Sequence, residues 1–174
     1  MATYLVLTAI GDDRPGLVEQ LALVVARNSG NWLESSMSQL AGKFAGILRV
    51  SVPDENVEQL VSELESLSGS LKLVIEKGTG NQSGEVSQTL SLSLIGNDRP
   101  GIIKEISTAL ASQRVNVEEL NTECSIAPMS GETLFNAQVR LRVPSDLDLD
   151  ALQRRLEQIA DDLIVDIQFN PIIA

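Results

Sequence analysis

The sequence predicts an α+β protein made of two copies of one small domain. Three observations predict it: a seven-residue motif that occurs twice, apolar spacings that follow each motif in the same order, and a polar, glycine-rich segment between the copies. The motif Ile10–Gly16 (IGDDRPG) recurs as Ile95–Gly101 (IGNDRPG), at an offset of 85 residues. Over residues 4–31 this offset leaves ten of 28 positions identical, so we interpret the chain as a tandem repeat.

The first copy has the predicted element order βαββαβ. A short apolar strand covers Tyr4–Ile10, and Leu17, Leu21 and Val25 then recur at the spacing of one helix face. The remaining expected elements are strands near 31–40 and 44–52, a helix opened by Pro53, and a last strand near 70–76.

The second copy repeats this order. Leu90, Leu92 and Leu94 alternate with serines, as in a strand with one buried face, and a helix is expected after the motif. The remaining expected elements are strands near 116–126 and 133–143, a helix after Pro144, a last strand near 163–169, and about six extra residues near 125–132. We therefore expect two ferredoxin-like domains with antiparallel sheets and helices on one face. Their predicted bounds are residues 1–78 and 87–174, joined by a linker at 79–86.

Composition limits the possible partners. The net charge is −11 and only 3% of residues are aromatic, so each core must consist of aliphatic side chains. Nucleic-acid binding draws most of its affinity from Lys and Arg on phosphates, and the sequence contains no basic stripe. We therefore expect neither direct DNA or RNA binding nor attachment to an anionic membrane.

The sequence also predicts a cytoplasmic protein. Its one cysteine, Cys124, allows no disulfide within the chain, which fits a reducing compartment. The first residues lack the basic and apolar parts of a signal peptide. No apolar run approaches the roughly 18 residues that a membrane span needs.

Enzymatic activity is not expected. The chain has no histidine, which excludes histidine-based catalytic arrangements and metal sites, and no cofactor is indicated. Cys124 is interpreted as a buried or half-buried small side chain. Asp146, Asp148 and Asp150 recur at every second residue. A calcium loop would also need a Gly and a distal Glu in register, so the three are interpreted as helix-capping residues.

The motif loop is the best-preserved segment between the copies, although loops ordinarily vary more than cores. A structural interpretation explains Gly11 by a turn with positive φ, Pro15 by the first turn of a helix, and Asp13 by a helix cap. Their counterparts in the second copy are Gly96, Pro100 and Asp98. This interpretation leaves Arg14 and Arg99 unexplained, because a cation beside a helix N-terminus is electrostatically unfavourable.

A ligand-binding interpretation explains the arginines. Free N–H groups at a helix start favour a carboxylate, an adjacent arginine can clamp it, and an aspartate can meet an ammonium group. Asn31 and Asn116, at the starts of the second strands, could add polar contacts. These are the groups that an amino acid requires, and the residues alone leave both interpretations open.

The βαββαβ unit with Asp-Arg-Pro-Gly after its first strand and Asn at its second resembles the ACT domain. The resemblance covers nearly the whole chain, and the bare tandem pair resembles the glycine cleavage system transcriptional repressor family. The same loop also occurs in ACT domains of uridylyltransferases and formyltetrahydrofolate deformylases, so the motif identifies the domain better than the protein.

The resemblance implies an amino acid site at an interface between two domains, near the first loop and the second strand. The implied ligand-binding residues are Gly11, Asp12, Asp13, Arg14, Pro15, Gly16, Asn31, Gly96, Asn97, Asp98, Arg99, Pro100, Gly101 and Asn116. It also implies a small ligand such as glycine, and action through a DNA-binding transcription factor as protein partner. The change from Asp12 to Asn97 is expected to make the two sites unequal.

A ligand-independent interaction module is the alternative. Ferredoxin-like sheets have exposed edge strands that can pair with other chains. Trp32, the only tryptophan, is interpreted as a packing residue, with a partner or dimer contact as its other role. The sequence leaves open whether the copies pair within one chain or across a homodimer.

Overall fold

The computed structural model describes residues 1–78, 87–159 and 164–169. The chain divides into two compact units, Met1–Ser83 and Gly84–Ala174. The linker predicted at residues 79–86 lies outside the described residues.

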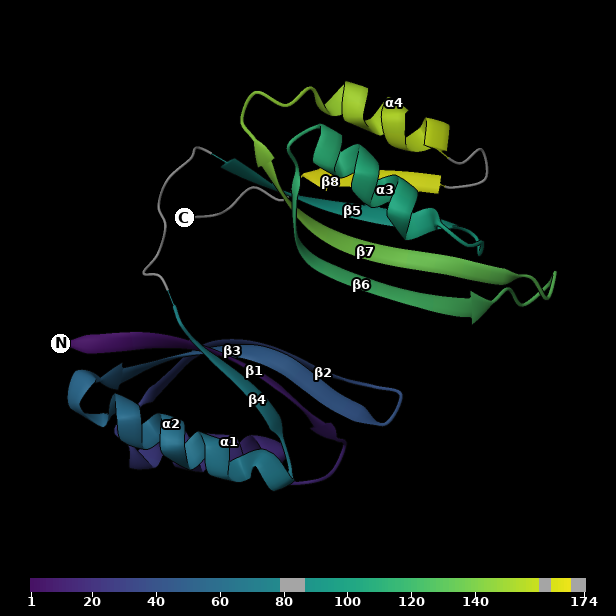
Figure 1. Cartoon of the computed structure of the whole chain (residues 1–174). Coiled ribbons are helices and arrows are strands. Elements are labelled where there is room, and N and C mark those ends of the chain that lie inside the picture. Colours follow the sequence, from purple (N-terminus) through teal and green to yellow (C-terminus); the bar gives the residue numbers. More distant parts are fainter. Residues whose placement is uncertain (79–86, 160–163, 170–174) are drawn as a thin grey trace. The chain divides into compact units, whose positions relative to one another are not determined.

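The first unit has the element order predicted for it (Figure 1). Its main elements are β1 (Ala2–Asp12), α1 (Leu17–Arg27), β2 (Asn31–Leu40), β3 (Lys43–Pro53), α2 (Val57–Glu65) and β4 (Lys72–Lys77). Two short 3₁₀ turns, Asp54–Asn56 and Ser66–Gly69, flank α2. Pro53 was expected to open the second helix, but it ends β3, and the 3₁₀ turn separates it from α2.

The second unit repeats the order. Its elements are β5 (Ser87–Asn97), α3 (Ile102–Ser112), β6 (Asn116–Ile126), β7 (Thr133–Pro144), α4 (Leu149–Ile159) and β8 (Ile164–Phe169). Pro144 likewise ends β7 and does not open α4. Four of the extra residues of this copy lie between β6 and β7, where six residues replace the two that join β2 to β3. The strands β6 and β7 are each one residue longer than β2 and β3. Asp148 caps α4 as expected, because its Oδ1 accepts a hydrogen bond from the Ala151 N–H at 3.0 Å.

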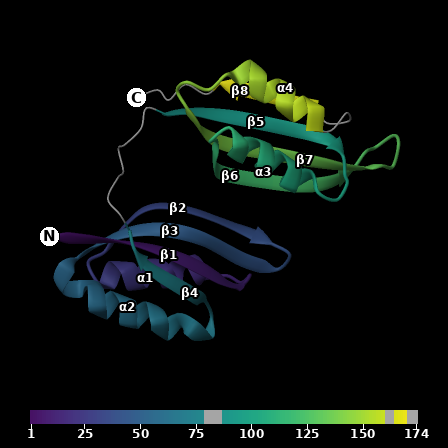
Figure 2. The ribbon, with the colours of Figure 1, turned by 45° about the horizontal axis from the view of Figure 1, so that its top comes forward.

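Each unit has one four-stranded antiparallel sheet, in the orders β2-β3-β1-β4 and β6-β7-β5-β8. In each unit both helices cover one face of its sheet (Figures 1 and 2). This confirms the predicted pair of ferredoxin-like domains. Within the described residues, no helix is long and apolar enough to cross a membrane.

Each unit has its own core between sheet and helices. Both cores are mainly aliphatic, but the second also contains Phe135, contrary to the expectation of aliphatic side chains alone. Alternating strand residues such as Leu5 and Leu7 meet Leu60 and Leu64 of α2 in the first unit. The second core is built in the same way, with Leu152 and Leu156 of α4 in the places of Leu60 and Leu64. Because the two clusters share no residue, each unit carries the apolar burial that stabilises it.

The sheet faces that the helices leave uncovered differ in chemistry. In the first unit Thr8 lies in register with Ile47 and Val74, whose side chains are 54% and 58% exposed. The counterpart of Thr8 is Ser93, whose neighbour on β7 is Gln138. The Ser93 hydroxyl donates to Gln138 Oε1 at 2.7 Å. The uncovered face is therefore apolar at the centre of the first sheet and polar at the same place in the second.

Candidate ligand site at the motif loops

The two motif loops have nearly the same backbone. In each, a glycine is the N-cap of the following helix: Gly16 has φ 92° and ψ −3°, and Gly101 has φ 94° and ψ −4°. This left-handed conformation is one that glycine adopts at little cost. The carbonyl of each glycine accepts the first hydrogen bond of its helix, from Gln20 N–H at 2.9 Å and from Glu105 N–H at 3.0 Å.

Three structural roles expected for the first loop are wrong. The glycine with positive φ is Gly16, whereas Gly11 lies in β1 without positive φ. Pro15 lies outside the helix, which begins at Leu17. No side-chain hydrogen bond is made at the N-cap, so Asp13 does not cap α1.

The same corrections hold in the second loop. Gly96 has no positive φ, Pro100 precedes the helix that begins at Ile102, and Asp98 makes no capping hydrogen bond. The first N–H groups of α1 and α3 have no intrahelical partner, as at any helix start, and no N-cap side chain binds them here. That is the arrangement in which a helix start can receive an anion.

Close packing, and not turn geometry, explains why residue 11 is glycine. A Cβ placed on Gly11 would lie 2.5 Å from the backbone O of Ser70 and 3.0 Å from Cδ2 of Leu71. Contacts this short force atoms apart, and a backbone oxygen cannot simply rotate away. Gly11 therefore allows the end of β1 to approach the segment before β4.

Backbone hydrogen bonds hold both loops against the adjacent hairpin. Asp13 N–H donates to the Gly42 carbonyl at 2.9 Å, and Asp98 N–H donates to the Thr133 carbonyl at 2.9 Å. The aspartates of the motif are thus fixed through their main chains, which leaves their carboxylates exposed.

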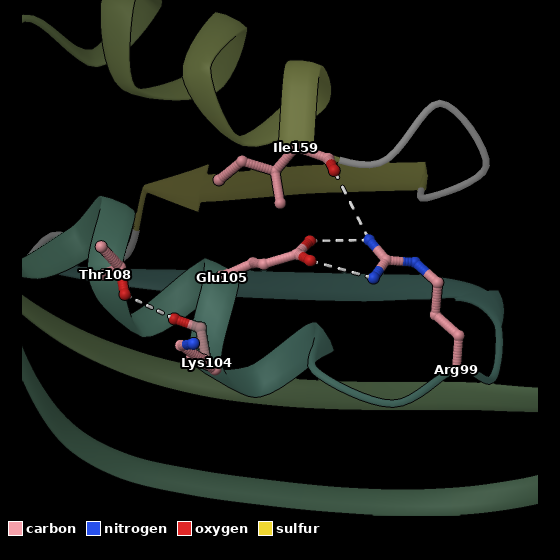
Figure 3. A network of polar contacts seen from close by, with 5 residues as sticks. All are labelled: Arg99, Lys104, Glu105, Thr108 and Ile159. Atoms are coloured by element: carbon pink, nitrogen blue, oxygen red, sulfur yellow. Dashed lines mark hydrogen bonds and ion pairs between the residues drawn. The ribbon is translucent and has the colours of Figure 1, made fainter.

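The two arginines of the motif differ sharply. Arg99 makes a bidentate ion pair with Glu105 of α3, with Nη1–Oε1 at 3.1 Å and Nη2–Oε2 at 2.7 Å (Figure 3). Its Nη2 also donates to the Ile159 carbonyl at the end of α4, at 3.4 Å. Arg14 is exposed, and no hydrogen bond or salt bridge joins its guanidinium to any residue that the structure describes.

The Arg99 guanidinium has an electrostatic consequence at Glu105. The hydrogen bond from Arg99 is the main cause that holds the pKa of the Glu105 carboxyl below its ordinary value, with a smaller contribution from the Arg99 charge. Glu105 is thus ionised at neutral pH, and its carboxylate engages both Nη atoms of Arg99.

The one motif position that differs between the copies also differs in its contacts. Asp12 forms an exposed ion pair with Lys43 of β3, and the hydrogen bond from Lys43 is the main cause that lowers the pKa of the Asp12 carboxyl. The strand partner of its counterpart Asn97 is Leu134, which carries no charge. A cleft of about 330 Å³ opens beside Asp12 and Lys43, with Lys72 at its rim.

Asn31 and Asn116 open β2 and β6, as predicted, but they lie away from the loops of their own units. Asn31 pairs with Ser51, which pairs with Tyr4 at the beginning of β1. The motif loop follows the other end of β1, eight residues along, a distance of roughly 25 Å for a strand. The second unit has the same geometry, since Asn116 pairs with Arg142. One unit therefore does not bring its asparagine and its loop together.

Two further expectations concern side chains outside the loops. Trp32 is half-buried and packs against the core of the first unit, and its Nε1 donates to Ser35 Oγ at 3.2 Å, which confirms a packing role. Cys124 is exposed on β6, so its predicted burial is wrong: β6 is an edge strand, and most of its side chains face solvent. The described part of the chain contains no cluster of side chains suited to a metal ion.

Sequence reasoning overlooked Glu105, Gln20 and Lys43. Glu105 and Gln20 occupy the same position of the repeat, six residues after each motif arginine. The sequence therefore shows a neutral amide in one copy and a carboxylate in the other, and this difference could have indicated a partner for Arg99. Lys43 gave no signal in the sequence, because its pairing with Asp12 depends on the register of two strands.

Comparisons with known proteins agree with this architecture. Models of the ACT domain match residues 3–77 and 84–165. The glycine cleavage system transcriptional repressor of Escherichia coli (strain K12) is 22% identical over 163 residues, covering 92% of this chain and 85% of the relative.

Two solved structures are similar over nearly their whole length. The crystal structure of an unknown protein from Galdieria sulphuraria has a TM-score of 0.87 and 26% identity, covering 98% of this chain and 99% of that one. A protein provisionally described as a glycine cleavage system transcriptional repressor has a TM-score of 0.72 and 19% identity, with the same coverage. At that identity, the second similarity concerns the fold alone.

Proposed function

We propose that this chain, which belongs to the ACT-domain family as two ACT domains in tandem, is a regulatory protein that responds to a small amino acid. The observation that carries the proposal is Arg14. Its guanidinium is exposed and has no hydrogen-bond or salt-bridge partner among the described residues, and it stands before an uncapped helix start. A carboxylate would satisfy both groups. We assign the carboxylate of the ligand to Arg14 and the first N–H groups of α1, and its ammonium group to Asp13.

Glycine is the ligand that we propose first. The E. coli relative is named for the glycine cleavage system, and a glycine-responsive regulator of that system would sense its substrate. The motif residues Gly11–Gly16 and Gly96–Gly101 remain the proposed binding segments. Asn31 and Asn116 cannot contact a ligand held by the loop of their own unit, given their place at the other end of the sheet.

The regulatory output is proposed to pass through a protein partner, a DNA-binding transcription factor. Direct DNA binding is disfavoured because the net charge of −11 would repel phosphates. Ligand binding alters the output only if the ligand binds the partner-competent and partner-incompetent states with different affinity.

Thermal unfolding with each common amino acid tests the ligand. At about 100 times its Kd, a ligand stabilises the folded state by about 2.7 kcal/mol, a shift of several degrees for a domain of this size. Arg14→Ala should reduce the shift, whereas Arg27→Ala, at the exposed far end of the same helix, should leave it unchanged. The absence of a shift with every amino acid would refute the proposal.

One observation favours a second candidate function, a ligand-independent interaction module. Ile47 and Val74 expose apolar side chains on either side of Thr8, on the uncovered face of the first sheet, where a protein partner could bury them. A reporter of glycine cleavage gene expression distinguishes the two functions. A constitutive module loses its output on Ile47→Asp and keeps it on Arg14→Ala, whereas a sensor loses its glycine response on Arg14→Ala.

A further inference from the structure

We infer that Glu105 is a built-in competitor for the motif arginine of the second unit, so that the two units bind a ligand carboxylate with unequal affinity. The inference rests on the proposed function, because it concerns the same loops. The first unit is assigned the stronger site, and the second unit a weaker site that opens only when Glu105 leaves Arg99.

The first step is the geometry of the ion pair. The Glu105 carboxylate meets Arg99 through two parallel contacts, at 3.1 and 2.7 Å (Figure 3). A bidentate pair of this kind is how a guanidinium binds the carboxylate of a ligand. The two partners are 33% and 41% exposed, so the pair lies at the surface, where a ligand can displace it.

The second step is the corresponding arrangement in the first unit. Gln20 replaces Glu105 there, and its Oε1 accepts a hydrogen bond from the Ser70 hydroxyl at 3.2 Å. That hydroxyl also contacts the Leu67 carbonyl at 3.1 Å. Ser70 thus joins α1 to the segment after α2, and Arg14 takes no part in the connection.

Arg99 makes the equivalent connection in the second unit. Leu152 and Leu156 are the buried residues of α4, as Leu60 and Leu64 are of α2, so Ile159 corresponds to Leu67. Arg99 links Glu105 to the Ile159 carbonyl, as the Ser70 hydroxyl links Gln20 to the Leu67 carbonyl. The motif arginine therefore has a structural role in the second unit and none of this kind in the first.

The proposed difference in ligand affinity between the two loops does not follow from their net charge. At the preceding helix position the first unit has Glu19 and the second has Lys104, which more than offsets the carboxylate gained at Glu105. The two loops differ in whether the guanidinium of the motif arginine already binds a carboxylate, as Arg99 does. Glu105 lies six residues from Arg99 in the same chain, so its carboxylate is present at a high effective concentration. It therefore competes with a ligand carboxylate for the Arg99 guanidinium.

The expected penalty is moderate. Exposed ion pairs contribute at most about 1 kcal/mol, so displacement of Glu105 should weaken ligand binding to the second unit by up to about fivefold. Two sites separated by such a factor fill over a wider range of ligand concentration than two identical sites.

Site-resolved titration of the full chain tests the inference. Backbone amide NMR signals of both loops would be followed as glycine, alanine and serine are added in turn. The loop at Arg14 should saturate at an up to fivefold lower concentration than the loop at Arg99. Glu105→Gln should lower the midpoint of the second loop toward that of the first, and Gln20→Glu should raise the midpoint of the first.

A matched control is Glu157→Gln, which removes an exposed carboxylate from the same unit and should move neither midpoint. If Glu105→Gln does not fold, Gln20→Glu alone decides the outcome. The inference would be overturned if both wild-type loops saturate at the same ligand concentration and neither Glu105→Gln nor Gln20→Glu changes that midpoint. That result would leave the proposed function intact. The absence of binding at either loop would overturn both.

Discussion

In the first unit the motif arginine, Arg14, ends in solvent, whereas its counterpart Arg99 in the second unit binds Glu105. The backbones of the two loops are nearly the same, with N-cap φ angles of 92° and 94°. The difference comes from a residue outside the motif, where Gln20 in one copy is replaced by Glu105 in the other. A preserved motif can therefore lie in two chemical settings, because its neighbours determine whether its charge is available.

The largest expected effect tests whether the two cores stabilise their units independently. Leu60 and Leu152 occupy equivalent helix positions and are fully buried. Each change to alanine should cost about 2–5 kcal/mol, because it removes apolar burial and leaves a cavity. Hydrogen exchange should show faster opening of β1–β4 in Leu60→Ala and of β5–β8 in Leu152→Ala. Equal acceleration in both units by either variant would contradict the separation of the cores.

The next effect concerns the close approach at Gly11. Gly11→Ala should destabilise the first unit by about 1–3 kcal/mol, because the added Cβ meets the backbone oxygen of Ser70. Gly69→Ala is the control, since no atom lies within 4 Å of a Cβ there. Denaturant unfolding measures both variants, and equal stability of the two would show that the contact relaxes freely.

A smaller effect is the difference in thermal stability between the Arg99→Ala and Arg14→Ala variants without ligand. Arg99→Ala removes the link between Glu105 and Ile159 and should lower the unfolding temperature of the second unit. Arg14→Ala removes no hydrogen bond within the described residues and should leave the first unit unchanged. Differential scanning calorimetry without ligand compares the two. A greater loss from Arg14→Ala would contradict the assignment of a structural role to Arg99.

The smallest effect is the pH response at the differing motif position. The Asp12 pKa is lowered by Lys43, so the contribution of this pair is complete above the ordinary pKa of an aspartate. It is lost as pH falls through the lowered value. Carboxyl NMR titration should place the Asp12 midpoint below the ordinary range, and Lys43→Ala should return it. An Asp12 midpoint that does not respond to Lys43→Ala would show that the pair is not formed.

Much of the fold follows from the sequence because short-range patterns determine it. Alternation in Leu90, Leu92 and Leu94 locates a half-buried strand, and the repeat makes each copy a check on the other. The bounds of the motif loop, and the structural role of each residue in it, were harder to predict. The turn glycine proved to be Gly16 and not Gly11, since Gly11 is required by packing against a segment nearly 60 residues away.

The inequality of the loops could be predicted only in part. The change from Asp12 to Asn97 is visible in the sequence, and it indicated unequal sites. The pairing of Arg99 with Glu105 was overlooked although both residues are visible in the sequence, whereas the contact of Arg99 with the Ile159 carbonyl depends on where α4 ends. Such contacts depend on the packing of helices against the sheet, which periodicity alone does not specify.

Side-chain NMR of the two arginines in the full chain, without ligand, tests the central claim most directly. The bidentate contact with Glu105 should slow rotation of the Arg99 guanidinium and give separate Nη signals, whereas Arg14 should give averaged signals. Glu105→Gln should speed this rotation, although Arg99 keeps its contact with the Ile159 carbonyl. Averaged signals for both arginines in the wild-type chain would contradict the claim that Glu105 holds Arg99 while Arg14 has no hydrogen-bond or salt-bridge partner among the described residues.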